Sequence, residues 1–259
     1  MSNSAGKDVC LAIHGAFQSN ENLVGAELVL RDLGFKEVHM PNLAGHGAEN
    51  DIKTSEKSLT ERLTEDLLSR QQIKQSLDAE TIGRAILIGH SLGASVALAV
   101  AKQLAMKTEY LNLILVEPIF WLGKKCDGQD DLLNNLETHI PENKTQIEIT
   151  NYLKELLNGD NCASEQISTL AKLAKSSKVW ITLIRGGRKS IQSKKEFKIE
   201  LSDRVLSQSI VGQEIGSLVP DDYCYRELFD NQLAIKQAGH NPFIHTCFYR
   251  WLKLVACQI

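Results

Sequence analysis

The sequence contains six cysteines but no pair of them with CxxC spacing. The cysteines are scattered over positions 10, 126, 162, 224, 247 and 257. Structural zinc sites and the disulfide frameworks of small secreted proteins both depend on closer or more regular cysteine spacing. We therefore expect reduced thiols, a cytoplasmic location and no bound metal.

The sequence also lacks an excess of positive charge, because its net charge is −3 at pH 7. A surface that binds nucleic acid is basic, so we expect no nucleic-acid partner. Residues 1–8 are polar and have no apolar signal-peptide core. The longest nearly apolar run, residues 85–101, is broken by His90 and by several Ser and Gly, which argues against a membrane span. We find no nucleotide-binding glycine loop and no internal repeat, and we expect no cofactor.

Short apolar runs alternate with helical patterns along most of the chain. The predicted strands are Val9–Ile13, Lys36–Met40, Ala85–Ile88, Leu111–Val116, Val179–Ile184 and Gln232–Gln237. The predicted helices are Asn22–Leu33, one from a capping box at Ser58 to about Leu77, one after residue 93, and Phe243–Ala256. This alternation predicts a parallel sheet covered by helices on both faces. With 259 residues, 43% of them hydrophobic, one α/β domain with an insertion is the natural expectation.

One stretch combines a buried strand, a sharp turn and a helix. Ala85–Ile88 is apolar, residues 89–93 read Gly-His-Ser-Leu-Gly, and a run of small residues follows. Glycines on both sides of a serine allow a strained strand-to-helix turn in which the hydroxyl stands clear of the sheet. The N–H groups that begin the helix would point to where an oxyanion forms. We therefore predict that Ser91 is a nucleophile.

The first predicted strand ends in His14-Gly15. Together with the GxSxG turn, this pair resembles the α/β-hydrolase family, in which the backbone N–H after His-Gly and the N–H after the serine form the oxyanion hole. The resemblance implies that Ala16 and Leu92 supply these N–H groups and that Phe17 contacts the substrate. We expect His14 to brace the loop rather than to transfer protons.

A serine nucleophile needs a base near pKa 7, and the base needs an orienting acceptor. Residues 238–243, Ala-Gly-His-Asn-Pro-Phe, follow the last predicted strand and are similar to the catalytic-histidine turn of the same family. The chain order of serine, acid and histidine also suits this family. The resemblance therefore implies that His240 is the base, and we expect His245 to be a packing or surface residue.

The third member of a triad is less obvious in this sequence. The family usually places an aspartate after the strand that here is Val179–Ile184, but residues 186–189 read Gly-Gly-Arg-Lys. Glu117 ends the neighbouring strand, and a carboxylate at that edge can reach the same imidazole. We predict Glu117 as the acid. The alternatives are Asp203, Asp221 and Asp222, which also precede the histidine.

Arg185 and Arg188 stand where the usual aspartate is missing. A glutamate at the earlier strand combined with an arginine is similar to decarboxylating polyketide thioesterases, so the resemblance implies that these arginines bind an anionic substrate group. The alternative is a solvated basic surface that includes Lys189, Lys194 and Lys195.

Residues 120–178 interrupt the alternation of strands and helices, with helical periods around Leu132–Leu136, Ile147–Leu157 and Ile167–Ala174. By position they resemble the family's lid, which would cover the acyl part of a substrate, with a plain packing domain as the alternative. Residues 1–119 and 179–259 then form an α/β-hydrolase core, a mainly parallel sheet with helices on both faces. For residues 190–230 we expect two helices and a loop at residues 219–222.

These features together predict a serine hydrolase that cleaves a small-molecule ester or thioester through an acyl-enzyme. An acyl carrier protein is a further candidate partner. The alternatives are a chain-terminating, decarboxylating polyketide thioesterase, a lyase on the same scaffold and a non-catalytic binding module. The intact Ser91, His240 and GxSxG glycines argue against the binding module.

Overall fold

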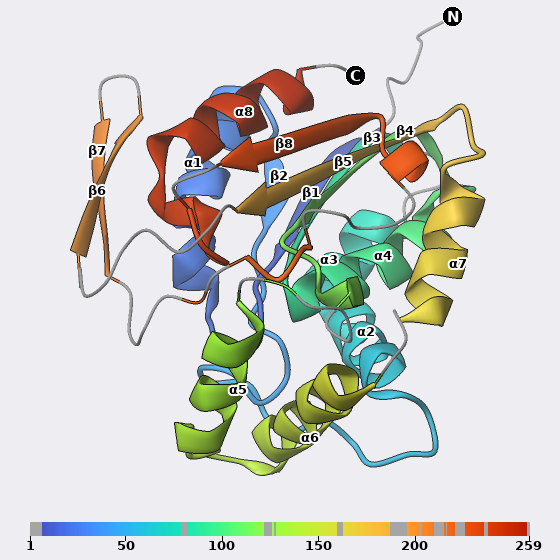
Figure 1. Cartoon of the computed structure of the whole chain (residues 1–259). Coiled ribbons are helices and arrows are strands. Elements are labelled where there is room, and N and C mark those ends of the chain that lie inside the picture. The colour runs from blue at the N-terminus through green and yellow to red at the C-terminus, as the bar shows by residue number, and fades with distance from the viewer. Residues whose placement is uncertain are drawn as a thin grey trace, which may run out of the picture.

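Six parallel strands form the central sheet of the computed structural model, in the order β2-β1-β3-β4-β5-β8 (Figure 1). The strands are β1 (Lys7–Ile13), β2 (Glu37–His39), β3 (Ile82–His90), β4 (Thr108–Val116), β5 (Val179–Gly186) and β8 (Asn231–Ile235). The structure describes residues 7–78, 82–121, 126, 128–159, 163–186, 196–201, 204–209, 215, 217–220, 226–235 and 238–257. The six parallel strands confirm the sheet that was predicted from the sequence.

Helices cover both faces of this sheet. The helices α1 (Val24–Asp32) and α8 (Thr246–Ala256) pack against each other on one face. The opposite face carries α2 (Leu59–Ser69), α3 (Gln71–Leu77) and α4 (Leu92–Leu104). Because helices bury both faces, residues 85–88 of β3 and residues 113–116 of β4 are continuously apolar.

The strands β3, β4 and β5 end in register with one another at one edge of the sheet. His90, the last residue of β3, is opposite Val116 of β4, and Val116 is opposite Ile184 of β5. Backbone hydrogen bonds continue past the strands, since Ser91 N donates to Val116 O at 3.0 Å and Glu117 N donates to Ile184 O at 2.8 Å. This register places the residues that follow β3 and β4 side by side.

The helix predicted from Ser58 to about Leu77 is two helices. Its capping box is confirmed, because Ser58 and Glu61 exchange hydrogen bonds between side chain and backbone. Arg70 then adopts an extended conformation (φ −69°, ψ 128°) between α2 and α3. Its guanidinium donates to the carbonyl of Asn42 and to Asp66.

The prediction of two helices within residues 190–230 is wrong for residues 196–209. Here β6 (Glu196–Leu201) and β7 (Arg204–Ser209) pair as an antiparallel hairpin, which stands apart from the main sheet beside α8 (Figure 1). Phe197, Ile199 and Leu201 alternate with charged residues, and this period of two is typical of a strand.

Three helices between β4 and β5 form the predicted insertion. They are α5 (Gln129–Thr138), α6 (Lys144–Asn158) and α7 (Ser164–Leu173). α7 packs on α4, whereas α5 and α6 pack against each other at the end of the molecule farthest from β8 (Figure 1). Of the insertion that we predicted as a lid, α7 therefore packs on the core, whereas α5 and α6 form a separate helical pair.

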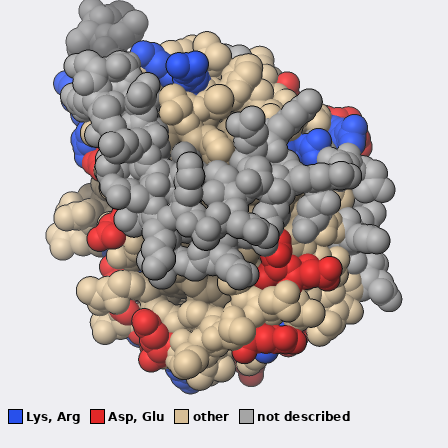
Figure 2. Space-filling view, turned by 60° about the vertical axis from the view of Figure 1, so that its left-hand side comes forward, with Lys and Arg blue, Asp and Glu red and all other residues tan. Residues whose placement is uncertain are grey.

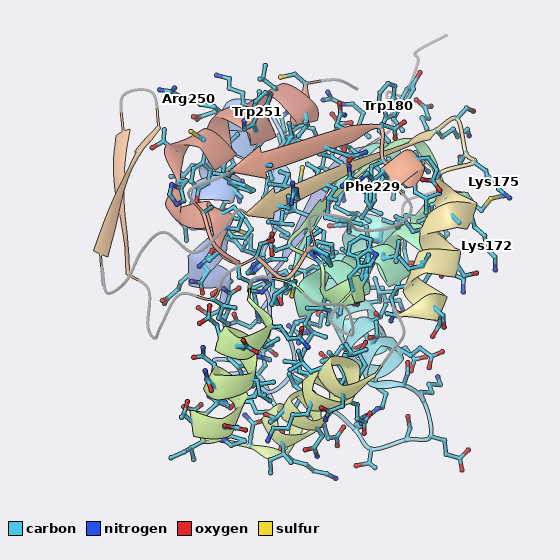
Figure 3. The ribbon with its side chains drawn as sticks, in the orientation of Figure 1. Lys172, Lys175, Trp180, Phe229, Arg250 and Trp251 are labelled. Atoms are coloured by element: carbon cyan, nitrogen blue, oxygen red, sulfur yellow. The ribbon has the colours of Figure 1, made fainter. Side chains whose placement is uncertain are left out.

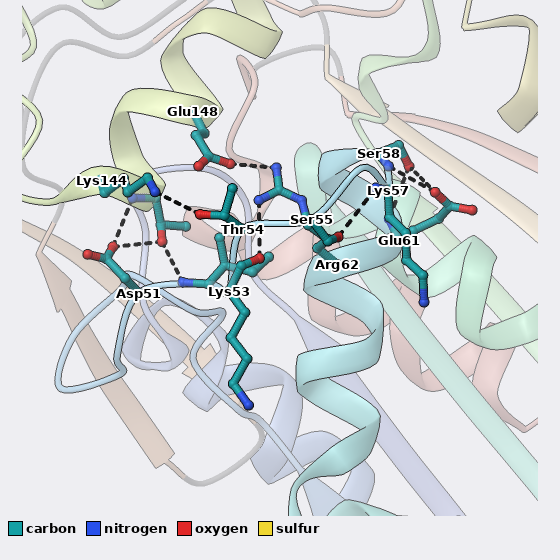
Figure 4. A network of polar contacts seen from close by, with 12 residues as sticks. Asp51, Lys53, Thr54, Ser55, Lys57, Ser58, Glu61, Arg62, Lys144 and Glu148 are labelled. Atoms are coloured by element: carbon teal, nitrogen blue, oxygen red, sulfur yellow. Dashed lines mark hydrogen bonds and ion pairs between the residues drawn. The ribbon is translucent and has the colours of Figure 1, made fainter.

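Polar contacts fasten α6 to the loop that precedes α2 (Figure 4). The Thr145 hydroxyl accepts a hydrogen bond from Ile52 N at 2.8 Å and donates to Asp51 at 2.7 Å. Arg62 of α2 pairs with Glu148 of α6 at 2.5 Å, and both side chains are largely buried. These contacts anchor α6 to the loop that precedes α2.

The exposed tryptophans Trp180 and Trp251 lie on β5 and α8, away from α5 and α6 (Figure 3).

Across the described ranges, no helix combines the length and the apolar character needed to cross a membrane.

Candidate active site

Ser91 occupies a strained turn between β3 and α4. Its backbone has φ 54° and ψ −119°, a conformation that residues other than glycine rarely adopt. The flanking glycines are sterically required, because a Cβ on Gly93 would overlap the carbonyl of Ile13 and one on Gly89 would overlap the backbone of α4. The glycines of the GxSxG motif therefore have the mechanical role predicted for them.

Backbone strain is concentrated around this turn. In the described ranges, three non-glycine residues have positive φ angles: Phe17 (57°), Ser91 (54°) and Glu117 (46°). They follow β1, β3 and β4, and so lie at the same edge of the sheet. Strained residues that cluster in this way are typical of active sites, where the surrounding structure holds them in place.

Two buried histidines shape the loop after β1. His14 Nε2 accepts the Leu43 N–H at 2.9 Å, and His46 Nε2 accepts the Phe17 N–H at 3.0 Å. Burial lowers the pKa of His14 to about 3 and also lowers the pKa of His46, so both rings are neutral and able to accept these bonds. These contacts support the bracing role expected for His14. In the described structure the Ala16 N–H has no hydrogen-bond partner.

His240 and Glu117 are in direct contact. His240 Nδ1 lies 3.2 Å from Glu117 Oε2, and the Glu117 side chain is fully buried. The carboxylate reaches the imidazole because the strained Glu117 follows β4 while His240 follows β8, two positions away in the sheet. This is the geometry of an acceptor that orients a histidine.

Three further groups hold the Glu117 carboxylate. Oε1 accepts hydrogen bonds from Gly186 N at 2.5 Å and Ser217 Oγ at 2.6 Å, and Oε2 accepts one from Leu218 N at 2.7 Å. All these donors stabilise a carboxylate, which can only accept. Sequence reasoning missed Gly186, Ser217 and Leu218. The Gly-Gly sequence after β5 was the available signal, because a side chain on Gly186 would overlap the backbone of Gly239.

Ser91 and His240 line one cavity of about 470 Å³. Its other described lining residues are Ala16, Phe17, Gln18, His90, Ile119, Leu132, Asn135, Leu136, Thr138, His139, Glu142, Leu153, Ile215 and Asn241. Phe17 packs on His139, with ring centroids 4.1 Å apart, and so joins the loop after β1 to the segment after α5. Within the described residues Ser91 makes no hydrogen bond to His240. Such bonds often tighten only when substrate is bound.

The structure does not bring Arg185 to this cavity. Arg185 lines a separate hollow with Arg226 and Gln232, beside β8. It precedes Gly186, the residue that does reach Glu117. Arg188 and the alternative acids Asp203, Asp221 and Asp222 lie outside the described residues.

Comparisons with known proteins identify the fold. A model of the Alpha/beta hydrolase family matches residues 10–183, more than half of the chain. The chain therefore belongs to the alpha/beta hydrolase family, and its six-stranded parallel sheet with a helical insertion between β4 and β5 is an α/β-hydrolase fold. No curated protein matches the sequence.

Solved structures share this fold at low sequence identity. A haloalkane dehalogenase from Paraglaciecola agarilytica NO2 is 10% identical, with a TM-score of 0.58 over 98% of this chain and 84% of its own. A thioesterase domain from the curacin biosynthetic pathway is 16% identical, with a TM-score of 0.54 over 98% and 92% of the two chains. The ferulic-acid complex of Est1E from Butyrivibrio proteoclasticus is 14% identical, with a TM-score of 0.52 over 99% of this chain and 90% of its own. These similarities concern the fold.

Proposed function

We propose that this protein is a serine hydrolase that cleaves a carboxylic ester or thioester of a small molecule. The contact between Glu117 and His240, at the edge of a cavity that Ser91 also lines, is the observation that carries the proposal. A nucleophile on a strained turn, an imidazole and a buried carboxylate are the three groups that acyl transfer by serine requires.

In the first half of the reaction, Ser91 Oγ attacks the substrate carbonyl while His240 Nε2 takes the hydroxyl proton. Glu117 accepts the hydrogen bond from Nδ1–H and stabilises the imidazolium that forms. The negative charge on the carbonyl oxygen is met by the N–H groups of Ala16 and Leu92. Ala16 lines the cavity, and Leu92 is the first residue of α4, where the N–H groups have no partner within the helix.

In the second half, the tetrahedral intermediate collapses and His240 gives its proton to the departing alcohol or thiol, which leaves an ester on Ser91. Water then attacks this acyl-enzyme, with His240 as the base. A second tetrahedral intermediate forms at the same N–H groups and breaks down to the free acid and Ser91.

The cavity favours an uncharged acyl group. Ile119, Leu132, Leu136 and Leu153 provide apolar walls, and Glu142 contributes a carboxylate. No Lys or Arg occurs among the described lining residues. Acidic side chains also gather on the lower half of the face in Figure 2, and α5 has Asp130 and Asp131 in its first turn. These charges support a neutral ester over the anionic substrate of a decarboxylating thioesterase.

The helices α5 and α6 act as a lid over the acyl group. Asn135, Leu136 and Leu153 come from these two helices and line the cavity together with Ser91. Because α6 is fastened to the loop before α2, it serves as a fixed wall of the acyl site.

Ester hydrolysis by the Ser91→Ala variant tests the proposal. We expect hydrolysis of p-nitrophenyl esters by the wild-type protein and a loss of at least about 10³-fold in kcat for the variant. Circular dichroism should show an unchanged fold. A series of acyl lengths and acyl-CoA thioesters then defines the substrate class. Equal activity of the two proteins would refute the proposal, and turnover of a substrate without an acyl-enzyme would indicate a lyase.

A further inference from the structure

His90, the residue before the nucleophile, connects segments that are far apart in the sequence. Its Nε2 lies 2.6 Å from the carbonyl oxygen of His240, and its Nδ1 lies 2.8 Å from Gln18 Oε1. The same Gln18 oxygen accepts the Gly15 N–H at 3.0 Å. His90 thus joins the histidine turn, through Gln18, to the loop after β1.

The ring of His90 also packs directly on the candidate base. Its centroid lies 4.8 Å from that of His240 at an interplanar angle of 37°, and 5.2 Å from the ring of Phe243. The side chain is fully buried, and burial together with the neighbouring His240 lowers its pKa far below the usual value. His90 is therefore a neutral imidazole with one N–H and one lone pair.

A neutral ring can satisfy only one of its two polar contacts fully. Both facing atoms are oxygens, so an N–H on Nε2 would donate to the His240 carbonyl and an N–H on Nδ1 would donate to the Gln18 side chain. The Gln18 oxygen already accepts the Gly15 N–H, and the contact with the His240 carbonyl is the shorter of the two, 2.6 Å against 2.8 Å. We therefore assign the single N–H to Nε2, where it donates to the His240 carbonyl.

We propose that His90 is a positioning residue whose Nε2–H holds the backbone of His240 and so aims the imidazole of His240 at Ser91. The proposal rests on the proposed function, because it assigns His90 a part in the same reaction. His90 itself transfers no proton. Its effect is to fix the histidine turn, which the structure connects to β3 through this side chain.

Replacement of His90 by glutamine or by asparagine tests its two hydrogen-bond contacts one at a time. The amide nitrogen of glutamine can take the place of Nε2, and that of asparagine can take the place of Nδ1. We expect His90→Gln to retain most of kcat and His90→Asn to lower kcat on the order of 10- to 100-fold with little change in KM. His90→Phe, which retains the ring packing but neither bond, should resemble His90→Asn. His39→Gln, a change at a half-buried histidine on β2, serves as the control.

The pH dependence of kcat/KM distinguishes positioning from proton transfer. We expect the acidic limb to keep its midpoint in His90→Gln and His90→Phe, because His90 itself transfers no proton. A midpoint that moves in both variants, or full activity of His90→Phe with an unchanged melting temperature, would overturn the proposal. Equal losses in the glutamine and asparagine variants would also overturn it, because the bond to His240 would then have no special effect.

A measurement that is independent of activity completes the test. In ¹⁵N-histidine spectra of the wild-type protein at pH 7, we expect His90 to be neutral with its proton on Nε2. A charged ring or a proton on Nδ1 would contradict the assignment. If Ser91→Ala were fully active, the proposed function would fail. If Ser91→Ala were inactive but His90→Asn were normal, only the present proposal would fail.

Discussion

His240 Nδ1 and Glu117 Oε2 lie 3.2 Å apart, although the two residues are separated by 123 positions in the chain. The carboxylate is fixed on its other sides by Gly186, Ser217 and Leu218. A carboxylate with three other donors has little freedom to turn, so the orientation of the imidazole is set before substrate arrives. In the proposed triad, the acid therefore follows β4 rather than β5.

Replacing Glu117 with glutamine should nearly abolish activity. The amide retains the size of the side chain, but it can turn its NH₂ toward Nδ1 and favour the wrong tautomer of His240. We expect kcat to fall by about 10³- to 10⁴-fold. The matched variants Asp221→Asn and Asp222→Asn should remain active, and steady-state kinetics on one ester checks all three. An active Glu117→Gln together with an inactive aspartate variant would assign the acid to that aspartate.

The Gly186→Ala substitution tests the backbone support of Glu117. Its Cβ would overlap the backbone of Gly239 and Ala238, which leads into His240. We expect overpacking to lower the free energy of unfolding by about 1–3 kcal/mol. We also expect kcat to fall by a larger factor than that by which KM rises. Gly159→Ala is the control, because its nearest contact would be an ordinary 3.4 Å. Urea unfolding and ester kinetics provide the readouts, and equal behaviour of the two variants would exclude the tight approach at Gly186.

Buried histidines should make the protein less stable in mild acid. Folding lowers the pKa of His14 to about 3 and also lowers the pKa values of His46 and His90, whereas all three titrate near 6.5 in the unfolded chain. The unfolded state therefore binds more protons, and stability falls as the pH decreases below about 6.5. His14, whose folded pKa is about 3, contributes about 1.4 kcal/mol per pH unit once the pH is well below 6.5, and His46 and His90 act in the same direction.

Urea unfolding at pH 7.5 and pH 5.5 checks this expectation. His14 alone predicts a loss of about 1.4 kcal/mol between these two pH values, and His46 and His90 increase this loss. A free energy of unfolding that does not change, or that increases at pH 5.5, would show that these rings are not held neutral in the folded state.

The anchoring of α6 should affect substrate binding more than chemistry. Thr145→Val removes the hydroxyl that bonds to Ile52 and Asp51. Because α6 would be held less firmly without these two hydrogen bonds, we expect KM for long-chain esters to rise by about 3- to 10-fold, or about 1 kcal/mol, with kcat nearly unchanged. Thr169→Val on α7 should leave both constants unchanged. A fall in kcat alone would mean that α6 does not form a wall of the acyl site.

The parts of the fold that depend on local sequence were predictable. The turn at Ser91 needs a buried strand, glycines and a small-residue helix, and all of these are contiguous in the chain. The position of Glu117 could be predicted because the end of a parallel strand is recognisable from its apolar run and Pro118. The break at Arg70 was not predicted, because no glycine or proline marks it in the sequence.

The parts of the site that depend on distant contacts were not predictable. Ser217 and Leu218 lie in a segment without a clear period, and their bonds to Glu117 are formed across about 100 positions. His90 occupies an unspecified position of the GxSxG motif, and its contact with His240 spans 150 positions. Arg185 stood next to the missing aspartate in the sequence, but the structure places it in another hollow.

Labelling with a fluorophosphonate tests the central claim most directly, because the reagent reacts with an activated serine. After reaction, intact-mass measurement and peptide mapping should show one adduct, located on Ser91. Ser91→Ala should take up none, and His240→Gln should react at least about 10³-fold more slowly. An adduct on another residue, or a labelling rate that does not depend on His240, would contradict the account.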